Sequence, residues 1–252
     1  MLSAMKSLIG VLLVAAPLLS DDFSKCGTLR SDRDLLFAIN GTNDDNIRAP
    51  WLAAVGKYSD QNYGGFLVIC SGSILTNRIL VTAAHCFPKS KIPPKPDMVR
   101  VGANKIDSRY TEDRKIKEYK IHPKYDYQNA TYYYDVALII LHEELRFTSK
   151  ISPICLPQET LVHPGENTHI SVQGWGEDAE GSHGKVASEV NVGIRSKDEC
   201  DDKFKNSGYL YSDQIKSYMP RYTEEILFCA NANLYRQSGT CYGDSGGPAI
   251  HR

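Results

Sequence analysis

The sequence predicts an all-β protein, and three observations lead to that class. Short apolar runs alternate with glycine, proline, asparagine and aspartate, as strands alternate with turns. Valine, isoleucine and tyrosine, which favour strands, are frequent in these runs. Apolar residues at helical spacing are scarce. Strands in this pattern are expected to form a sandwich or barrels.

The expected strands begin at residue 51 and are bounded by residues that favour turns. Asn77 precedes the third, Pro96 and Gly102 flank the fourth, Asp135 opens the fifth, and Gly176 closes the sixth. In chain order they cover 51–58, 64–75, 78–86, 98–102, 135–141 and 169–176. The segment 196–206 is the one expected to form a short helix.

Composition and charge exclude some classes of function. The 252 residues are 42% hydrophobic and 23% charged, as in an ordinary globular protein. The formal net charge is −1, so the chain has no basic field that would attract nucleic acid. The most densely charged stretch, 114–120, mixes both signs and is interpreted as a solvated strand or loop.

The N-terminus has the pattern of a secretory signal peptide, with cleavage expected after Ser20. Lys6 precedes a short apolar run, 8–19, which small and acidic residues follow. The alternative is a membrane anchor, but the run is short for a span. Secretion makes the sequons at Asn40 and Asn129 candidate glycosylation sites. We expect no membrane association once the signal peptide has been removed.

Secretion also means that the cysteines are expected to pair. The chain has seven, so one must stay unpaired or bond to another molecule. No spacing resembles a zinc ligand set, and no metal or other cofactor is expected.

Three short motifs carry residues that suit nucleophilic catalysis. His85 ends VTAAHC, Asp135 opens DVALIIL, and Ser245 lies inside GDSGGP. Taken alone, the histidine reads as a structural residue and the aspartate as a turn residue. Together they meet a chemical need, because a serine hydroxyl requires an adjacent base, and a carboxylate can orient a histidine that serves as that base.

With GWG at 174–176, these motifs in this order resemble the trypsin/chymotrypsin-like serine proteases, and the resemblance runs from Ala38 to Arg252. It implies two antiparallel β-barrels with the active site between them. His85 would be the general base and acid, Asp135 would orient it, and Ser245 would attack the peptide carbonyl. The backbone N–H groups of Gly243 and Ser245 would form the oxyanion hole.

The resemblance also implies how six of the cysteines pair. One bridge would lie beside the catalytic histidine, one in the second barrel, and one would tether a pro-segment, 21–37, to the protease domain, 38–252. These pairs are Cys70–Cys86, Cys200–Cys229 and Cys26–Cys155. Cys241 is left unpaired, because its partner in the family lies in a segment after the last residue of this sequence.

Activation and specificity follow from the same resemblance. Family members are made as zymogens, and the N-terminus that cleavage frees pairs with the aspartate before the serine, here Asp244. The new N-terminus would be Ala38, and Phe37 before it indicates a chymotrypsin-like activator or self-cleavage. A glycan on Asn40 would lie close to that N-terminus. Gly239, at the base of the primary pocket, supplies no charge, so no preference for Arg or Lys is expected.

The sequence ends shortly after GDSGGP, so we expect a C-terminally truncated domain with an incomplete second barrel. The predicted function is a secreted serine endopeptidase that forms an acyl-enzyme. The alternative is a catalytically inactive homologue or fragment that acts as a secreted binding protein. Expected partners are protein substrates, an activating protease and protease inhibitors.

Overall fold

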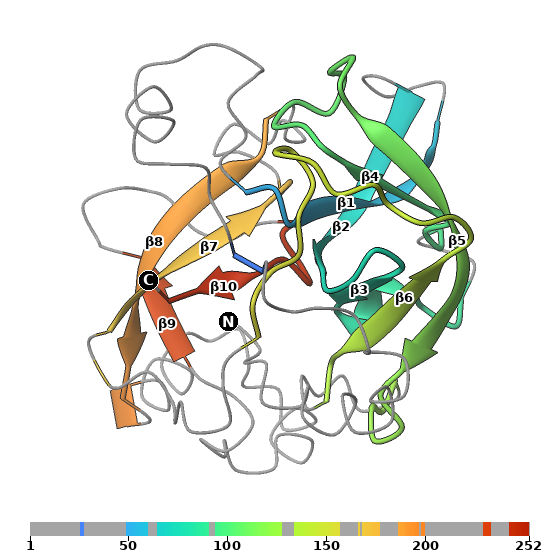
Figure 1. Cartoon of the computed structure of the whole chain (residues 1–252). Coiled ribbons are helices and arrows are strands. Elements are labelled where there is room, and N and C mark those ends of the chain that lie inside the picture. Colours follow the sequence, from blue (N-terminus) through green and yellow to red (C-terminus); the bar gives the residue numbers. More distant parts are fainter. Residues whose placement is uncertain are drawn as a thin grey trace.

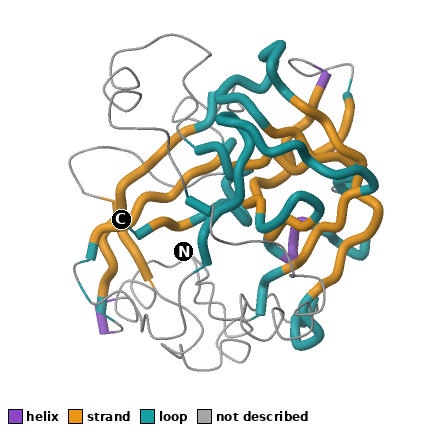
Figure 2. The backbone as a smooth tube through the Cα atoms, in the orientation of Figure 1, coloured by secondary structure: helices purple, strands orange, loops and turns teal. Residues whose placement is uncertain are grey.

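β-Strands make up most of the regular structure in the computed structural model of the chain (Figure 1, Figure 2). The structure describes residues 26–27, 49–59, 65–90, 94–127, 134–156, 166, 168–176, 186–196, 198–199, 229–232 and 242–251. Within these residues the strands form two groups, a closed barrel and a second sheet. Among them, no helix has the length and apolarity that a membrane crossing requires.

The first group is a six-stranded antiparallel barrel with the order β1-β2-β3-β6-β5-β4, closed by pairing of β4 with β1. Closure leaves no strand edge unpaired. The strands are β1 (Leu52–Tyr58), β2 (Phe66–Ile74), β3 (Ile79–Thr82), β4 (Met98–Val101), β5 (Glu112–Ile121) and β6 (Ala137–Leu141).

The interior of the barrel explains why its strands are so apolar. β3 is buried at every position, and β6 at all but one, so both read as continuous apolar runs in the sequence. Val55, Leu80 and Ile139 meet in one core cluster. β5 includes the charged stretch 114–120, for which the sequence predicted either a strand or a loop. Lys115 and Lys117 are exposed on it, while Ile116 packs against the core.

The second group is a four-stranded sheet with the order β10-β7-β8-β9, and it stays open among the described residues. Its core cluster consists of alternating residues of β7 and β8, such as Ile170, Val172 and Val192. The strands are β7 (His169–Gly174), β8 (Ser188–Arg195), β9 (Cys229–Ala232) and β10 (Ala249–Ile250).

The structure confirms the predicted all-β fold class, with a closed first barrel and a second sheet that is open among the described residues. All six expected strands are present. β5, β8, β9 and β10 were not among them, although β5 lies on the stretch interpreted as a solvated strand or loop. Asp198 and Glu199 are helical within the expected helix, and the rest of 196–206 beyond Ser196 and these two lies outside the described residues.

The two groups of strands share a core cluster that includes Trp51 and Phe66 from the barrel and Trp175 from the end of β7. The Trp51 Nε1–H donates to Gln173 Oε1 in β7 at 2.9 Å, and both side chains are buried. In Figure 1 the segment that leads into β10 lies between the barrel and the other strands of the second sheet. The candidate site is located at this junction.

Candidate active site

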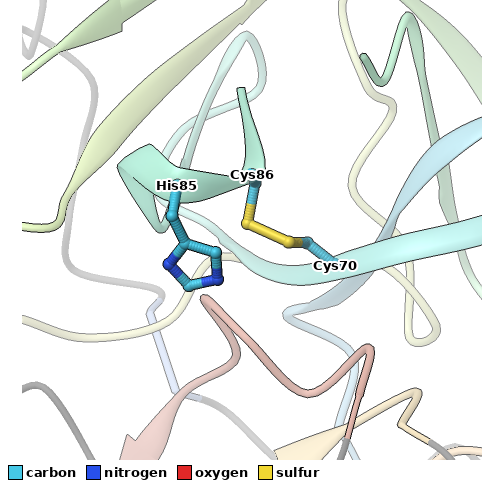
Figure 3. A group of neighbouring side chains, drawn as sticks. All are labelled: Cys70, His85 and Cys86. Carbon is cyan, nitrogen blue, oxygen red and sulfur yellow. A yellow bond between two sulfur atoms is a disulfide. The ribbon is translucent and has the colours of Figure 1, made fainter. Parts of the chain in front are cut away.

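His85 lies in a short 3₁₀ turn, Ala84–Cys86, directly after β3. Two features fix this turn to the barrel. Ala84 and Cys86 are buried, and a disulfide joins Cys86 to Cys70 in β2. Closing a loop of this length stabilises the folded state by about 3 kcal/mol on the chain-entropy estimate. Figure 3 shows the imidazole ring beside the disulfide, and 41% of the His85 side chain remains exposed.

Asp135 lies just before β6, and its carboxylate contacts both the backbone and the imidazole ring of His85. The backbone N–H of His85 donates to Oδ1 at 2.8 Å, and Nδ1 lies 2.6 Å from Oδ2. Only 3% of the Asp135 side chain is exposed. A buried carboxylate beside Nδ1 favours the tautomer with the proton on that nitrogen, so that Nε2 is left to act as a base.

Ser245 occupies a tight turn in the GDSGGP segment. The Gly247 N–H donates to the Asp244 carbonyl at 2.9 Å, and Gly246 has a φ of +81° between them. A positive φ at the third residue is the requirement of a type II turn and is easily met by glycine. Ser245 is the second residue of this turn, a position from which its side chain can project outward.

The barrel holds this turn in place through backbone contacts. The Ser71 N–H in β2 donates to the Ser245 carbonyl at 2.9 Å, and Cys86 Sγ lies 3.9 Å from the same oxygen. A Cβ on Gly246 would lie 2.2 Å from Thr82 Oγ1 at the end of β3. The turn therefore sits against the segment that carries His85, and Figure 3 shows the faint red C-terminal chain passing beside the imidazole.

Ser71 is a residue of the candidate site that sequence reasoning missed. Its fully buried hydroxyl donates to the Gly243 carbonyl at 2.8 Å and accepts from the Trp175 N–H at 2.9 Å. One side chain of the barrel thus links the segment before Ser245 to the end of β7. A serine next to a cysteine gives no sequence signal of this role, because its partners are 104 and 172 residues away.

Asp244 rests on the GWG segment. The Gly176 N–H donates to its Oδ1 at 2.7 Å, and a Cβ on Gly174 would lie 2.1 Å from that same oxygen. Both glycines therefore leave room for the carboxylate. The segment before Ser245 is held on one side by the barrel and on the other by the second sheet.

Aromatic residues brace the loops next to His85. The Tyr127 hydroxyl donates to the carbonyl of Phe87, two residues after His85, at 3.0 Å. Burial, with smaller contributions from Tyr119 and the Asp135 charge, raises the pKa of Tyr127, so its hydroxyl stays protonated and can donate. Phe87 itself stacks on Tyr119 of β5, with ring centroids 4.1 Å apart.

One group of described residues has metal-ligand character, namely Cys70, His85 and Cys86, whose ligand atoms lie within 4.8 Å of one another. Both sulfur atoms belong to the disulfide, so neither is a thiolate while that bond is intact. In this oxidised form the group does not fit a metal site.

The other predicted site residues divide into two sets. The structure joins Cys26 to Cys155, as the sequence analysis expects, and Cys229 is disulfide-bonded. The remaining residues lie outside the described residues, and their roles stay predictions. They are Phe37, Ala38, Asn40, Asn129, Cys200, Gly239 and Cys241, together with the signal peptide and most of the pro-segment.

Comparisons with known proteins agree on one family. The model of the Trypsin family matches residues 38–252. Clotting factor C of Tachypleus tridentatus is 30% identical over 235 residues, which cover 89% of this chain and 22% of that relative. Serine proteinase stubble of Drosophila melanogaster is 30% identical over 234 residues, or 89% of this chain and 27% of that relative. The chain thus spans about a quarter of the length of these two curated relatives.

Among solved structures, the chain resembles neuropsin, a serine protease expressed in the limbic system of mouse brain. The TM-score is 0.61 at 24% sequence identity, and the match covers 82% of this chain and 80% of the neuropsin chain. At this level of identity the likeness shows the fold alone.

Proposed function

Because the chain belongs to the trypsin family of serine proteases, we propose that it hydrolyses peptide bonds with His85, Asp135 and Ser245 as its catalytic residues. The observation that carries the proposal is the two-point contact of the buried Asp135 carboxylate with His85. This contact orients an exposed imidazole at the place where the barrel holds the backbone of Ser245.

The proposed mechanism depends on the transfer of one proton from Ser245 to His85 and from there to the leaving amine. His85 Nε2 removes the proton from the Ser245 hydroxyl as the oxygen attacks the carbonyl carbon of the substrate. The imidazolium that forms is stabilised by Asp135, which keeps its own charge. His85 then returns the proton to the leaving amine, and an acyl group remains on Ser245. A water molecule, activated by the same histidine, hydrolyses that ester.

Negative charge develops on the carbonyl oxygen during attack, and we assign its stabilisation to the N–H groups of Gly243 and Ser245. The φ of Gly243 is +98°, and the Ser71 hydroxyl holds its carbonyl. These contacts support a fixed orientation of the backbone at Gly243, whose N–H is one of the two proposed donors. One donor of this kind contributes about 3 kcal/mol to transition-state stabilisation in other hydrolases.

We further propose that the chain is secreted as a zymogen and acts on protein substrates after an activating protease has cleaved it. The Cys26–Cys155 disulfide supports an N-terminal segment that stays attached to the domain after cleavage. Cleavage between Phe37 and Ala38 would free the ammonium that pairs with Asp244. The clotting factor among the relatives favours a role in a protease cascade, with inhibitors among the partners.

The substrate preference is proposed from Gly239, which would leave the primary pocket without a charge. We expect cleavage after apolar or aromatic residues rather than after Arg or Lys. Cleavage of a peptide library after purification of the processed chain tests this preference. Dominance of Arg or Lys at the cleaved position would show that another residue forms the base of the pocket.

Labelling by a serine-directed fluorophosphonate tests the catalytic proposal directly. The secreted chain, with Ala38 as its N-terminus, is expected to react, and the Ser245→Ala variant is expected not to react. His85→Ala should lose labelling as well, because the hydroxyl then has no base. A soluble wild-type chain that takes no label would contradict the proposal and favour the inactive binding protein.

A further inference from the structure

The residue before Asp135 has an unusual backbone. Tyr134 has a φ of +56°, and it is the single non-glycine residue with a positive φ among those that the structure describes. This left-handed region is unfavourable for a residue with a large side chain. The conformation persists only where neighbouring contacts hold it, and such positions occur mainly at functional sites.

The ring of Tyr134 has such a contact. It stacks on His122, with ring centroids 4.8 Å apart and an interplanar angle of 8°. Lys124 Nζ lies 5.2 Å from the centroid of the same ring, which adds a cation–π contact. The side chain of Tyr134 is therefore held by two neighbouring residues, next to its strained backbone.

His122 is itself fixed. It is 7% exposed, and its Nδ1 accepts a hydrogen bond from the Lys124 N–H at 3.2 Å. Burial, with a smaller contribution from the Lys124 charge, lowers the pKa of His122, which agrees with a neutral ring whose Nδ1 is an acceptor. The ring is thus a flat neutral platform at the end of β5.

The same histidine holds the other side of Asp135. The His122 N–H donates to the Val136 carbonyl at 3.0 Å. The Val136 N–H donates to the Tyr134 carbonyl at 2.7 Å, which closes a three-residue turn centred on Asp135. Both neighbours of Asp135 in the chain are therefore connected to His122, one through its ring and one through its backbone.

We propose that His122 and Tyr134 are positioning residues, which hold the strained turn around Asp135 and thereby keep its carboxylate on His85. The side-chain stack stabilises a backbone conformation that tyrosine would otherwise avoid. Without the stack the turn relaxes, and the carboxylate moves away from the His85 N–H and Nδ1. The catalytic consequence rests on the proposed function, whereas the effect on the His85–Asp135 hydrogen bond does not.

Variants of Tyr134 separate the contribution of its ring from that of its backbone conformation. Tyr134→Phe keeps the stack, Tyr134→Ala removes it and keeps the strain, and Tyr134→Gly removes both. His122→Ala removes the stack from the other side. Tyr110→Ala is the matched control, since this tyrosine has Lys150 Nζ 3.6 Å from its ring but lies in the loop between β4 and β5.

The primary measurement is the NMR signal of the His85 Nδ1 proton, which needs no turnover. In Tyr134→Ala and His122→Ala this low-field signal should weaken, because a displaced carboxylate no longer holds the proton in a short hydrogen bond. Tyr134→Phe and Tyr110→Ala should match the wild type, and Tyr134→Gly should lie between Phe and Ala.

Turnover is the second measurement, normalised to the sites that fluorophosphonate labels. We expect a fall in kcat of about 10- to 100-fold in Tyr134→Ala, with KM little changed, since a small misplacement of a catalytic group has that effect. The double variant Tyr134→Ala with His122→Ala should lose no more than one single variant, because both remove the same contact.

Three results would overturn the inference. These are a wild-type His85 proton signal in Tyr134→Ala, an equal loss of that signal in Tyr134→Phe, and fully additive losses of kcat in the double variant. If Tyr134→Ala does not accumulate as folded protein, the comparison of Tyr134→Gly with Tyr134→Phe decides the same question. A wild-type chain that takes no label but shows the His85 signal would refute the proposed function alone.

Discussion

The closed barrel and the second sheet contribute unequally to the candidate site. The barrel pairs each of its strands on both sides and encloses a large apolar cluster. The second sheet has four described strands, and its core cluster is small. His85 and Asp135 belong to the barrel, and their mutual contacts lie entirely within it. The proposed base and the carboxylate proposed to orient it are therefore positioned by a self-contained unit.

Ser245, the proposed nucleophile, is positioned differently. Ser245 lies before β10, a two-residue strand that pairs only with β7 within the described part of the chain. Its turn gains its place from Ser71 and Thr82 in the barrel and from Gly176 after β7. The position of the serine therefore depends on contacts between the two groups of strands. Changes at that junction should affect catalysis before they affect the barrel.

Gly246→Ala is expected to break the junction most completely. A Cβ there would lie 2.2 Å from Thr82 Oγ1 and 2.6 Å from the Ala83 nitrogen, and φ is +81°. The turn must shift away from His85, so fluorophosphonate labelling and kcat/KM should fall by at least about 100-fold. The His85 Nδ1 proton signal should persist, because the barrel is unchanged.

Gly193→Ala in β8 is the matched control, since a Cβ at that position meets nothing within 4 Å. Its labelling and kcat/KM should stay near those of the wild type. Loss of the His85 signal in Gly246→Ala would contradict the independence of the barrel. Full activity in that variant would show that the turn can move without harm.

Ser71→Ala tests a smaller disturbance at the same junction. The change leaves the Trp175 N–H and the Gly243 carbonyl without the hydroxyl that bonds both. Leaving a buried polar group unpaired costs about 1–3 kcal/mol. We expect kcat to fall by about tenfold through the oxyanion donors, with KM less affected.

Ser171→Ala provides the comparison for that result. Ser171 is also buried, and its hydroxyl donates to Asn191 Oδ1 at 2.7 Å within the second sheet, away from the Ser245 turn. Thermal unfolding should register both variants, whereas only Ser71→Ala should lower kcat. Equal loss of kcat in the two would mean that the second sheet as a whole, rather than the junction, limits catalysis.

The sequence could suggest the parts of this site that lie in short motifs. His85, Asp135 and Ser245 could be proposed as catalytic residues because their neighbours form recognisable segments and their residue types meet one chemical need. Ser71 was not found, because a buried serine between apolar residues looks like any strand residue. Tyr134 was not singled out, because neither a positive φ nor a stack on His122 is visible in a run of three tyrosines.

The fold followed the same rule. Strands of the barrel were predicted from apolar runs, since both faces of β3 and β6 are covered. β8 was missed, because polar and small residues such as Asn191 and Gly193 interrupt it and only alternate positions reach the core. The pairing of β10 with β7 depends on residues more than seventy positions apart, which no local pattern records.

Asp113→Asn is expected to have the smallest effect on catalysis, because Asp113 bonds to Arg100 and Tyr58, away from the His85–Asp135 contact and the Ser245 turn. Arg100 Nε and Nη2 donate to the Asp113 carboxylate at 2.7 and 2.8 Å, and the Tyr58 hydroxyl donates to it as well. Burial by itself raises the pKa of Asp113. The hydrogen bonds from Arg100 and Tyr58, together with the charge of Arg100, lower this pKa by a larger amount, so the net shift is downward. Folding therefore favours the ionised carboxylate.

The sign of the pH dependence follows from that direction. The unfolded-state pKa of an aspartate is about 3.9, so this stabilisation is complete above that pH and is lost as the pH falls toward the lower folded value. Asp113→Asn should lower the free energy of unfolding at neutral pH and remove part of its decline below about pH 4. Glu112→Gln, whose salt bridge with Arg114 is more exposed, should change the free energy of unfolding and its pH dependence little.

Turnover per labelled site should equal that of the wild type in both variants, because neither residue touches the Ser245 turn. A fall in kcat per labelled site in Asp113→Asn would mean that a change at the Arg100–Asp113 ion pair disturbs His85. The proposed contrast between a self-contained barrel and a serine that depends on the junction would then be wrong.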